Sequence, residues 1–225
     1  MAPGSGSRPR SERRGERRLP MALAVILAAG LYLFIPPEFR LSEAVHLLYP
    51  LFLLALLVAL IIGDPGRVDR ESRWLRVATG VMIATITIAT TVSALRLVTG
   101  ILTGTQFGGA GKLLTIGAVV WVTMVIAFAL WYWHLDCGGA ASRANGTYST
   151  LPAFRFPEQD IDAPAYADWY PQFIDYLAVS FNTATAFGPT DVSAVRHWSK
   201  LWLITESAIS LSLIGLVVAR AINEL

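Results

Sequence analysis

The chain has 225 residues, of which 54% are hydrophobic and 15% charged, and its mean hydropathy is +0.53. Soluble domains carry about 25% charged residues, so this composition excludes an ordinary soluble domain and a disordered chain. The single cysteine, Cys137, excludes an intrachain disulfide framework. The formal net charge of +2 hides an asymmetry, because arginines crowd the residues before the first apolar run. These arginines are Arg8, Arg10, Arg13, Arg14, Arg17 and Arg18.

Residues 1–18 consist mostly of Gly, Ser, Pro, Glu and Arg, which predicts a basic, disordered and cytoplasmic tail. No aromatic residues interleave its arginines, so we expect no nucleic-acid partner. The apolar run 20–35 ends in Ile35-Pro36-Pro37 rather than in a small-residue cleavage site. It therefore predicts a retained first membrane span.

Three further spans are predicted over residues 42–62, 77–103 and 113–133. The third is rich in hydroxyl side chains that can bond to their own helix or to a neighbour. These are Thr85, Thr87, Thr90, Thr91 and Ser93. The fourth span closes with Trp131-Tyr132-Trp133-His134, an aromatic cluster typical of the headgroup level of a bilayer.

The last third of the chain departs from this regular pattern. A polar loop of about 35 residues precedes the stretch 171–188, whose apolar part, 176–187, is long enough for only half a membrane crossing. A full span follows over 198–222. The predicted fold is all-α, a multi-pass membrane protein of about five spans plus one re-entrant half-helix. Its regions are the tail 1–18, a three-span region 19–111 and a second region 112–225.

The half-length stretch carries the string Ser180-Phe-Asn-Thr-Ala-Thr-Ala-Phe-Gly-Pro-Thr-Asp191. Residues 172–222, with 113–133 as the preceding outer helix, resemble the pore module of potassium channels. The matching residues are Ser180, Thr183, Thr185, Gly188, Asp191, Val192, Lys200 and Leu201. Most of the chain after the tail also resembles an uncharacterised family of bacterial multi-pass membrane proteins, which carries no known activity.

This resemblance implies a homo-oligomer in the lipid bilayer, a tetramer if the likeness is true, that conducts monovalent cations. The constriction would be built by Thr183, Thr185, Phe187, Gly188 and Asp191. The string departs from the family where Pro189 replaces an aromatic residue and Thr190 replaces a glycine. Proline fixes φ and removes an N–H, so we expect relaxed or altered selectivity rather than a potassium-selective filter.

Ionisable side chains inside apolar segments are functional candidates by default. Glu206 lies about eight residues into the last span, where it either faces the ion path or forms a protonated or hydrogen-bonded tie to another helix, with the threonines of span three as candidate partners. Arg96, late in the third span, either snorkels to the interface or pairs with Glu206. Ser210, four residues after Glu206, is a second candidate for an interhelix polar contact.

Enzymatic chemistry has little support in the sequence. We find no nucleophile–base pair and no glycine loop that would cradle a phosphate, so we expect no enzyme and no cofactor. His134, Asp136 and Cys137 lack a second cluster to complete a metal site. The alternative to a pore is a non-conducting membrane scaffold or sensor built on the same module. A small transporter is disfavoured because no internal repeat is visible.

Basic loops orient a membrane protein with their positive charge inside. Five spans with the tail inside place the tail arginines, the arginines of the 63–76 loop, and Arg143, Arg155 and Arg196 on one face. The expected orientation therefore has the N-terminus in the cytoplasm of a cell. The re-entrant segment would then enter from the cytoplasmic side, inverted relative to a potassium channel. The alternatives are six full spans or a likeness that is only local.

Overall fold

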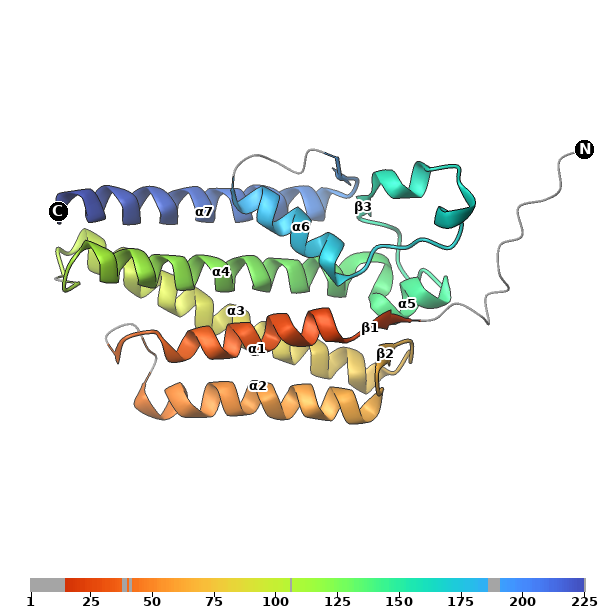
Figure 1. The fold of residues 1–225 in the computed structure, drawn as a ribbon, viewed down its shortest axis with the longest axis horizontal. Helices are drawn as coiled ribbons and strands as arrows, with labels where there is room; N and C mark the ends of the chain where they lie inside the picture. The colour runs from red at the N-terminus through yellow and green to blue at the C-terminus, as the bar shows by residue number, and fades with distance from the viewer. Residues whose placement is uncertain (1–14, 38–39, 41, 106, 186–190, 225) are drawn as a thin grey trace, which may run out of the picture.

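The computed structural model describes residues 15–37, 40, 42–105, 107–185 and 191–224 and shows an all-α protein (Figure 1). The long elements are the helices α1 (Leu19–Leu33), α2 (Glu43–Gly63), α3 (Arg73–Leu102), α4 (Ala110–Leu135), α6 (Phe173–Ala184) and α7 (His197–Asn223). Short elements are α5 (Ala140–Asn145), the two-residue strands β1 (Glu16–Arg17), β2 (Arg67–Val68), β3 (Phe154–Arg155) and β4 (Ser193–Ala194), and 3-10 turns at Asp136–Gly138, Pro157–Asp160 and Pro164–Tyr166.

Four of these helices, α2, α3, α4 and α7, are long and apolar enough to cross a membrane. The predicted spans agree with them to within a few residues at each end. The predicted first span is α1, which has 15 residues and is therefore about 22 Å long, shorter than the hydrocarbon core of a bilayer. The serine at position 42 caps α2 as expected, because its hydroxyl accepts a hydrogen bond from the Val45 N–H at 3.2 Å.

Helix α4 is the central helix of the bundle and packs against α1, α3, α6 and α7. In the most apolar 18-residue stretch of α4, 67% is buried inside the protein, against 22–39% in the corresponding stretches of α2, α3 and α7. Gly117 lets α7 approach closely, because a Cβ at this position would lie 2.8 Å from Val217. Helices α1 and α2 form an antiparallel pair on the far side of α4 from α7 (Figure 1).

The two small sheets and α5 lie at one end of the bundle, which we call the loop end (Figure 1). β1 pairs antiparallel with β2, and β3 pairs antiparallel with β4. The second pairing brings residues 193–194, directly before α7, beside the long loop from which α6 starts. The half-helix segment, residues 173–192, therefore begins and ends at the loop end. This is the topology expected for a re-entrant half-helix.

The residues that precede α1 are more structured than expected, and the long loop contains several short elements. Of the predicted disordered tail, residues 15–18 are described: Glu16 and Arg17 form β1, and the Glu16 side chain is buried. The long loop is ordered through α5, β3 and the 3-10 turns. The expected back-bonding of span-three threonines is confirmed for two of them, since Thr85 donates to the Val81 carbonyl and Thr87 to the Ile83 carbonyl, both at 2.8 Å.

Candidate functional site at the α4–α6–α7 interface

Glu206 lies fully buried where α4, α6 and α7 meet. Its Oε2 accepts a hydrogen bond from the Tyr132 hydroxyl of α4 at 2.6 Å, and its Oε1 makes a very short contact with the Ser180 hydroxyl of α6. The carboxyl group therefore joins three helices. A buried polar group of this kind stays in an apolar interior only when it is hydrogen-bonded.

Counting donors at Ser180 points to a neutral carboxyl group. The Ser180 hydroxyl lies 2.8 Å from the Val125 carbonyl oxygen of α4, which can only accept. A serine hydroxyl has one proton to donate. If that proton goes to Val125, the short Ser180–Glu206 contact needs a proton on Glu206. A protonated Glu206 satisfies both contacts without leaving a charge in the membrane interior.

The serines that follow Glu206 bind the end of α6. The Ser207 hydroxyl donates to the Thr183 carbonyl at 3.2 Å, and the Ser210 hydroxyl donates to the Ala184 carbonyl at 2.5 Å. The last carbonyls of a helix lack partners within the helix. Where water is absent, each unpaired group costs several kcal/mol. Ser207 and Ser210 of α7 therefore supply partners that the last carbonyls of α6 would otherwise lack.

Thr185 completes this capping arrangement. Its backbone N–H donates to the Phe181 carbonyl at 3.0 Å, and its hydroxyl lies 3.0 Å from the Asn182 carbonyl. All four residues 181–184 thus have occupied carbonyls. Ser210 lies roughly 20 Å along α7 from its start, near the middle of that helix. The C-terminus of α6 therefore sits at the mid-depth of the bundle.

A second polar cluster holds the long loop against α6 and the end of α4. The Asp136 carboxylate accepts a hydrogen bond from the Tyr176 hydroxyl of α6 at 2.5 Å and another from the Ala153 N–H at 2.6 Å. Arg143 is fully buried and stacks on the Tyr176 ring at 4.8 Å. Its guanidinium donates to the carbonyls of Trp133, Asp136 and Pro171 at 2.8, 2.7 and 3.1 Å.

Glu16 joins the N-terminal strand to this cluster. The Trp133 indole N–H donates to Glu16 Oε1 at 2.6 Å. Burial raises the pKa of Glu16 from 4.5 to about 7, while the positive charge of Arg143 and the Trp133 hydrogen bond lower it in part. A carboxyl group with this pKa exchanges its proton near neutral pH.

The structure places the predicted path residues in different surroundings. Thr183 is buried, and its hydroxyl donates to the Val179 carbonyl of its own helix at 2.8 Å. Thr185 is partly exposed and Asp191 is exposed. Phe187 and Gly188 lie outside the described residues, as do Pro189 and Thr190. Glu206 faces the interface between α4, α6 and α7, so it forms an interhelix tie, but to Tyr132 and Ser180 rather than to the threonines of span three.

The predicted contacts of Arg96 and Ser210 differ in outcome. Glu206 bonds to Tyr132 and Ser180, and no ion pair joins it to Arg96 in the described part of the chain. The partner expected for Glu206 on span three is thus replaced by α4 and α6. Ser210 makes interhelix contacts on both sides, since it also accepts a hydrogen bond from the Trp121 indole N–H at 2.7 Å.

Sequence reasoning missed Tyr132, Asp136, Arg143 and Tyr176. The aromatic cluster at the end of span four was expected at the lipid headgroups. Instead Tyr132 and Trp133 are buried in the protein and donate to Glu206 and Glu16. One available signal was the lone arginine of the Gly- and Ala-rich stretch after span four, which is Arg143.

Comparisons with known proteins found no match, so the proposal of a function rests on the contacts described above. No family model matches the chain, and no curated protein or solved structure matches it.

Proposed function

We propose that the protein is an integral membrane protein in which the half-helix segment lines a path for monovalent cations within a homo-oligomer. The observation that carries the proposal is α6, a 12-residue helix that starts at the loop end and stops at mid-depth. The negative end of its dipole points into the bundle, where it favours a cation. The resemblance of 172–222 to a potassium-channel pore module is part of the same proposal.

Oxygen atoms on the half-helix segment suit such a path. Thr185 is partly exposed and Asp191 is exposed, so a hydroxyl is accessible where α6 ends and a carboxylate is accessible just before β4 at the loop end. Rings of carboxylates and backbone or hydroxyl oxygens are the groups that cation pathways use. Glu206 has a different role in this proposal: it anchors α6 to α4 and α7 rather than contacting the ion.

Exposed apolar surface supports assembly into an oligomer. Large apolar side chains on α6 and α7 face away from the subunit. They are Ile174, Phe181, Leu201, Ile204, Leu211 and Ile222. Two helices and a half-helix cannot enclose a path alone, so a conducting form needs other copies to complete the wall. Lipid covers whatever part of this surface remains outside.

One observation favours the second candidate, a non-conducting scaffold. The carbonyls of residues 181–184 all have hydrogen-bond partners within the subunit. One lone pair of each of these carbonyl oxygens is therefore already engaged, which leaves the carbonyls less available to an ion. In the scaffold function, α6 would be an immobile helix that packs against α4 and α7 and holds them in place.

Cation flux separates the two functions. Purified protein is reconstituted into liposomes, its oligomeric state is measured in the same sample, and potassium and sodium efflux are recorded. The pore proposal predicts efflux from the wild type and a clear reduction in Asp191→Asn, with no change in Asp162→Asn, an exposed loop carboxylate. If the folded wild-type oligomer passes neither potassium nor sodium, the pore function is overturned and the scaffold function remains.

A further inference from the structure

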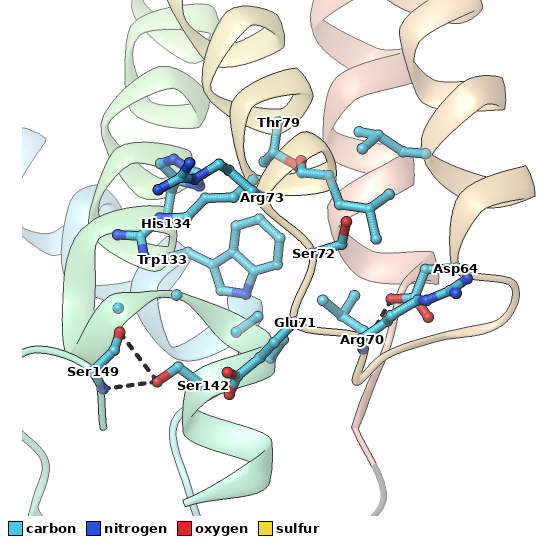
Figure 2. Close-up of a pocket in the computed structure, with 18 of the residues that line it drawn as sticks. Asp64, Arg70, Glu71, Ser72, Arg73, Thr79, Trp133, His134, Ser142 and Ser149 are labelled. Atoms are coloured by element: carbon cyan, nitrogen blue, oxygen red, sulfur yellow. Dashed lines mark hydrogen bonds between the residues drawn. The ribbon is translucent and has the colours of Figure 1, made fainter. Parts of the chain in front are cut away.

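A cavity of about 330 Å³ lies at the loop end of the bundle, between the ends of α2, α3 and α4 (Figure 2). Figure 2 shows Arg73 and His134 on one side of it and Asp64 and Arg70 on the other. Its volume is within the range of small-molecule sites. The charged residues that line it are Arg18, Arg70, Arg73, Arg76, Asp64 and Glu71.

The two carboxylates of the cavity already have partners. Asp64 accepts an ion-pair hydrogen bond from Arg18 at 3.0 Å, and Glu71 accepts a hydrogen bond from the Thr147 hydroxyl at 2.6 Å. The guanidinium groups of Arg73 and Arg76 make no hydrogen bond or ion pair with another described residue, although the Arg76 backbone N–H donates to the Ser72 carbonyl. The cavity therefore has two guanidinium groups that no carboxylate of the described chain neutralises.

Further donors face the same space. Arg18 is 6% exposed, and its Nε has no hydrogen-bond partner among the described residues. Ser72, the N-cap residue of α3, makes no capping hydrogen bond with its side chain. The first turn of α3 thus lacks a side-chain acceptor, and a helix N-terminus is a favourable place for an anion. Together these groups place in the cavity several donors that have no acceptor among the described residues.

We propose that this cavity binds a phosphate group, carried either by an anionic phospholipid or by a soluble phosphate ester. Guanidinium groups bind phosphate oxygens through paired hydrogen bonds, and the α3 dipole adds to the attraction. The position of the cavity favours a lipid headgroup. Trp74 is 50% exposed and Val77 is 60% exposed beside Arg73 and Arg76, at the end of a membrane-spanning helix. An acyl chain could lie along these side chains while its phosphate enters the cavity.

Binding is measured on the full-length protein. Native mass spectrometry in detergent counts and titrates bound phosphatidylglycerol, with phosphatidylcholine as the neutral-headgroup comparison. Inorganic phosphate and glycerol 3-phosphate are titrated separately, with the thermal midpoint of unfolding as the readout. Saturable phosphatidylglycerol binding with no response to the soluble phosphates identifies the lipid. A response to the soluble phosphates at sub-millimolar concentration identifies a soluble ester.

Charge and shape variants locate the site. The Arg73→Gln/Arg76→Gln double variant removes two exposed guanidinium groups, and we expect phosphate affinity to fall about tenfold or more. Ala141→Trp fills the lining of the cavity without changing its charge and should weaken binding similarly. The matched control is Arg17→Gln/Arg196→Gln, which removes two exposed guanidinium groups from the loop end outside the cavity lining.

The comparison among variants decides the proposal. Selective loss in the double variant and in Ala141→Trp, with the control within about twofold of wild type, supports a phosphate site in this cavity. Equal loss in the control would show general attraction to a basic surface and would overturn it. Absence of saturable binding to phosphatidylglycerol and to both soluble phosphates would also overturn it.

Discussion

Ser210 of α7 donates a hydrogen bond to the main-chain carbonyl of Ala184, the last residue of α6, at 2.5 Å. This contact fixes the tip of the half-helix at mid-depth and connects it through Ser210 to the Trp121 indole of α4. Ser207 and Ser210 of α7 are therefore explained as hydrogen-bond donors to the last carbonyls of α6. They do not require an ion.

Removing the Ser210 hydroxyl leaves the Ala184 carbonyl without a partner in the interior. Ser210→Ala should lower the free energy of unfolding by about 1–3 kcal/mol, the cost of an unsatisfied buried acceptor. Unfolding in mixed micelles measures the change. Ser212→Ala, an exposed position on the same helix, is the control and should change stability by less than about 0.5 kcal/mol.

The Tyr132–Glu206 contact predicts coupled stability effects. Tyr132→Phe, Glu206→Gln and the double variant form a cycle, and we expect a coupling free energy of about 0.5–3 kcal/mol. Glu206→Leu should be more destabilising than Glu206→Gln, because leucine leaves the Tyr132 hydroxyl without an acceptor. Additive single losses would show that the contact does not tie α4 to α7.

The raised pKa of Glu16 predicts that the stability of the folded protein falls as pH rises. Its pKa in the folded protein is about 7 against an ordinary value of 4.5, so the folded state holds this proton more tightly than the unfolded state. The stabilisation is fully present below pH 4.5 and is lost as pH rises through 7, a change of roughly 3 kcal/mol.

Thermal unfolding between pH 5 and 8 tests this dependence. Glu16→Gln keeps an acceptor for the Trp133 indole and removes the titrating group, so its midpoint should vary much less with pH. The positive charge of Arg143 lowers the pKa of Glu16 and the negative charge of Asp175 raises it. Neither of these two residues is therefore changed in the comparison. An unchanged pH profile in Glu16→Gln would assign the dependence to another group.

The three hydrogen bonds of Arg143 predict that even a conservative substitution at this position lowers the stability of the folded protein substantially. Lysine cannot reach three separate carbonyls with the geometry of a guanidinium, so Arg143→Lys should lower the free energy of unfolding by at least about 3 kcal/mol. Arg155→Lys is the control, because Arg155 is exposed and its ion pair with Asp160 contributes little. Equal stability of both variants would contradict the role given to Arg143.

Much of the fold could be predicted because membrane spans are set by run length. The bounds of α2, α3, α4 and α7 follow from apolar stretches that match the bilayer, and α6 stood out because its apolar part was too short. The rotation of each helix could not be predicted in the same way. Lipid is as apolar as a protein interior, so hydrophobicity does not distinguish the two faces of α4.

The candidate site was harder to predict than the spans for the same reason. Tyr132 at a helix end has the same local sequence whether it meets a headgroup or Glu206. Glu16 lies among arginines, a composition that indicates solvent exposure, yet β1 pairs with β2 and buries it. Long-range pairings of this kind leave no periodic signal in the sequence.

The arrangement of basic residues was partly predictable. The structure places β2, α5 and β3 at the same end of the bundle as β1 (Figure 1). These three elements contain Arg67, Arg143 and Arg155, respectively. This agrees with the predicted grouping of arginines on one face. That this face is cytoplasmic stays a prediction.

The sidedness of three single cysteines in a Cys137→Ser background tests the central claim most directly. Cysteine replaces Asp162 in the long loop, Asp191 at the end of the half-helix segment, and Asn223 at the end of α7, all exposed positions. A membrane-impermeant thiol reagent is applied to sealed vesicles. We predict that positions 162 and 191 label from the same side and 223 from the opposite side. Labelling of 191 from the side opposite to 162 would mean that α6 crosses the membrane, and would contradict the half-helix on which the proposed function rests.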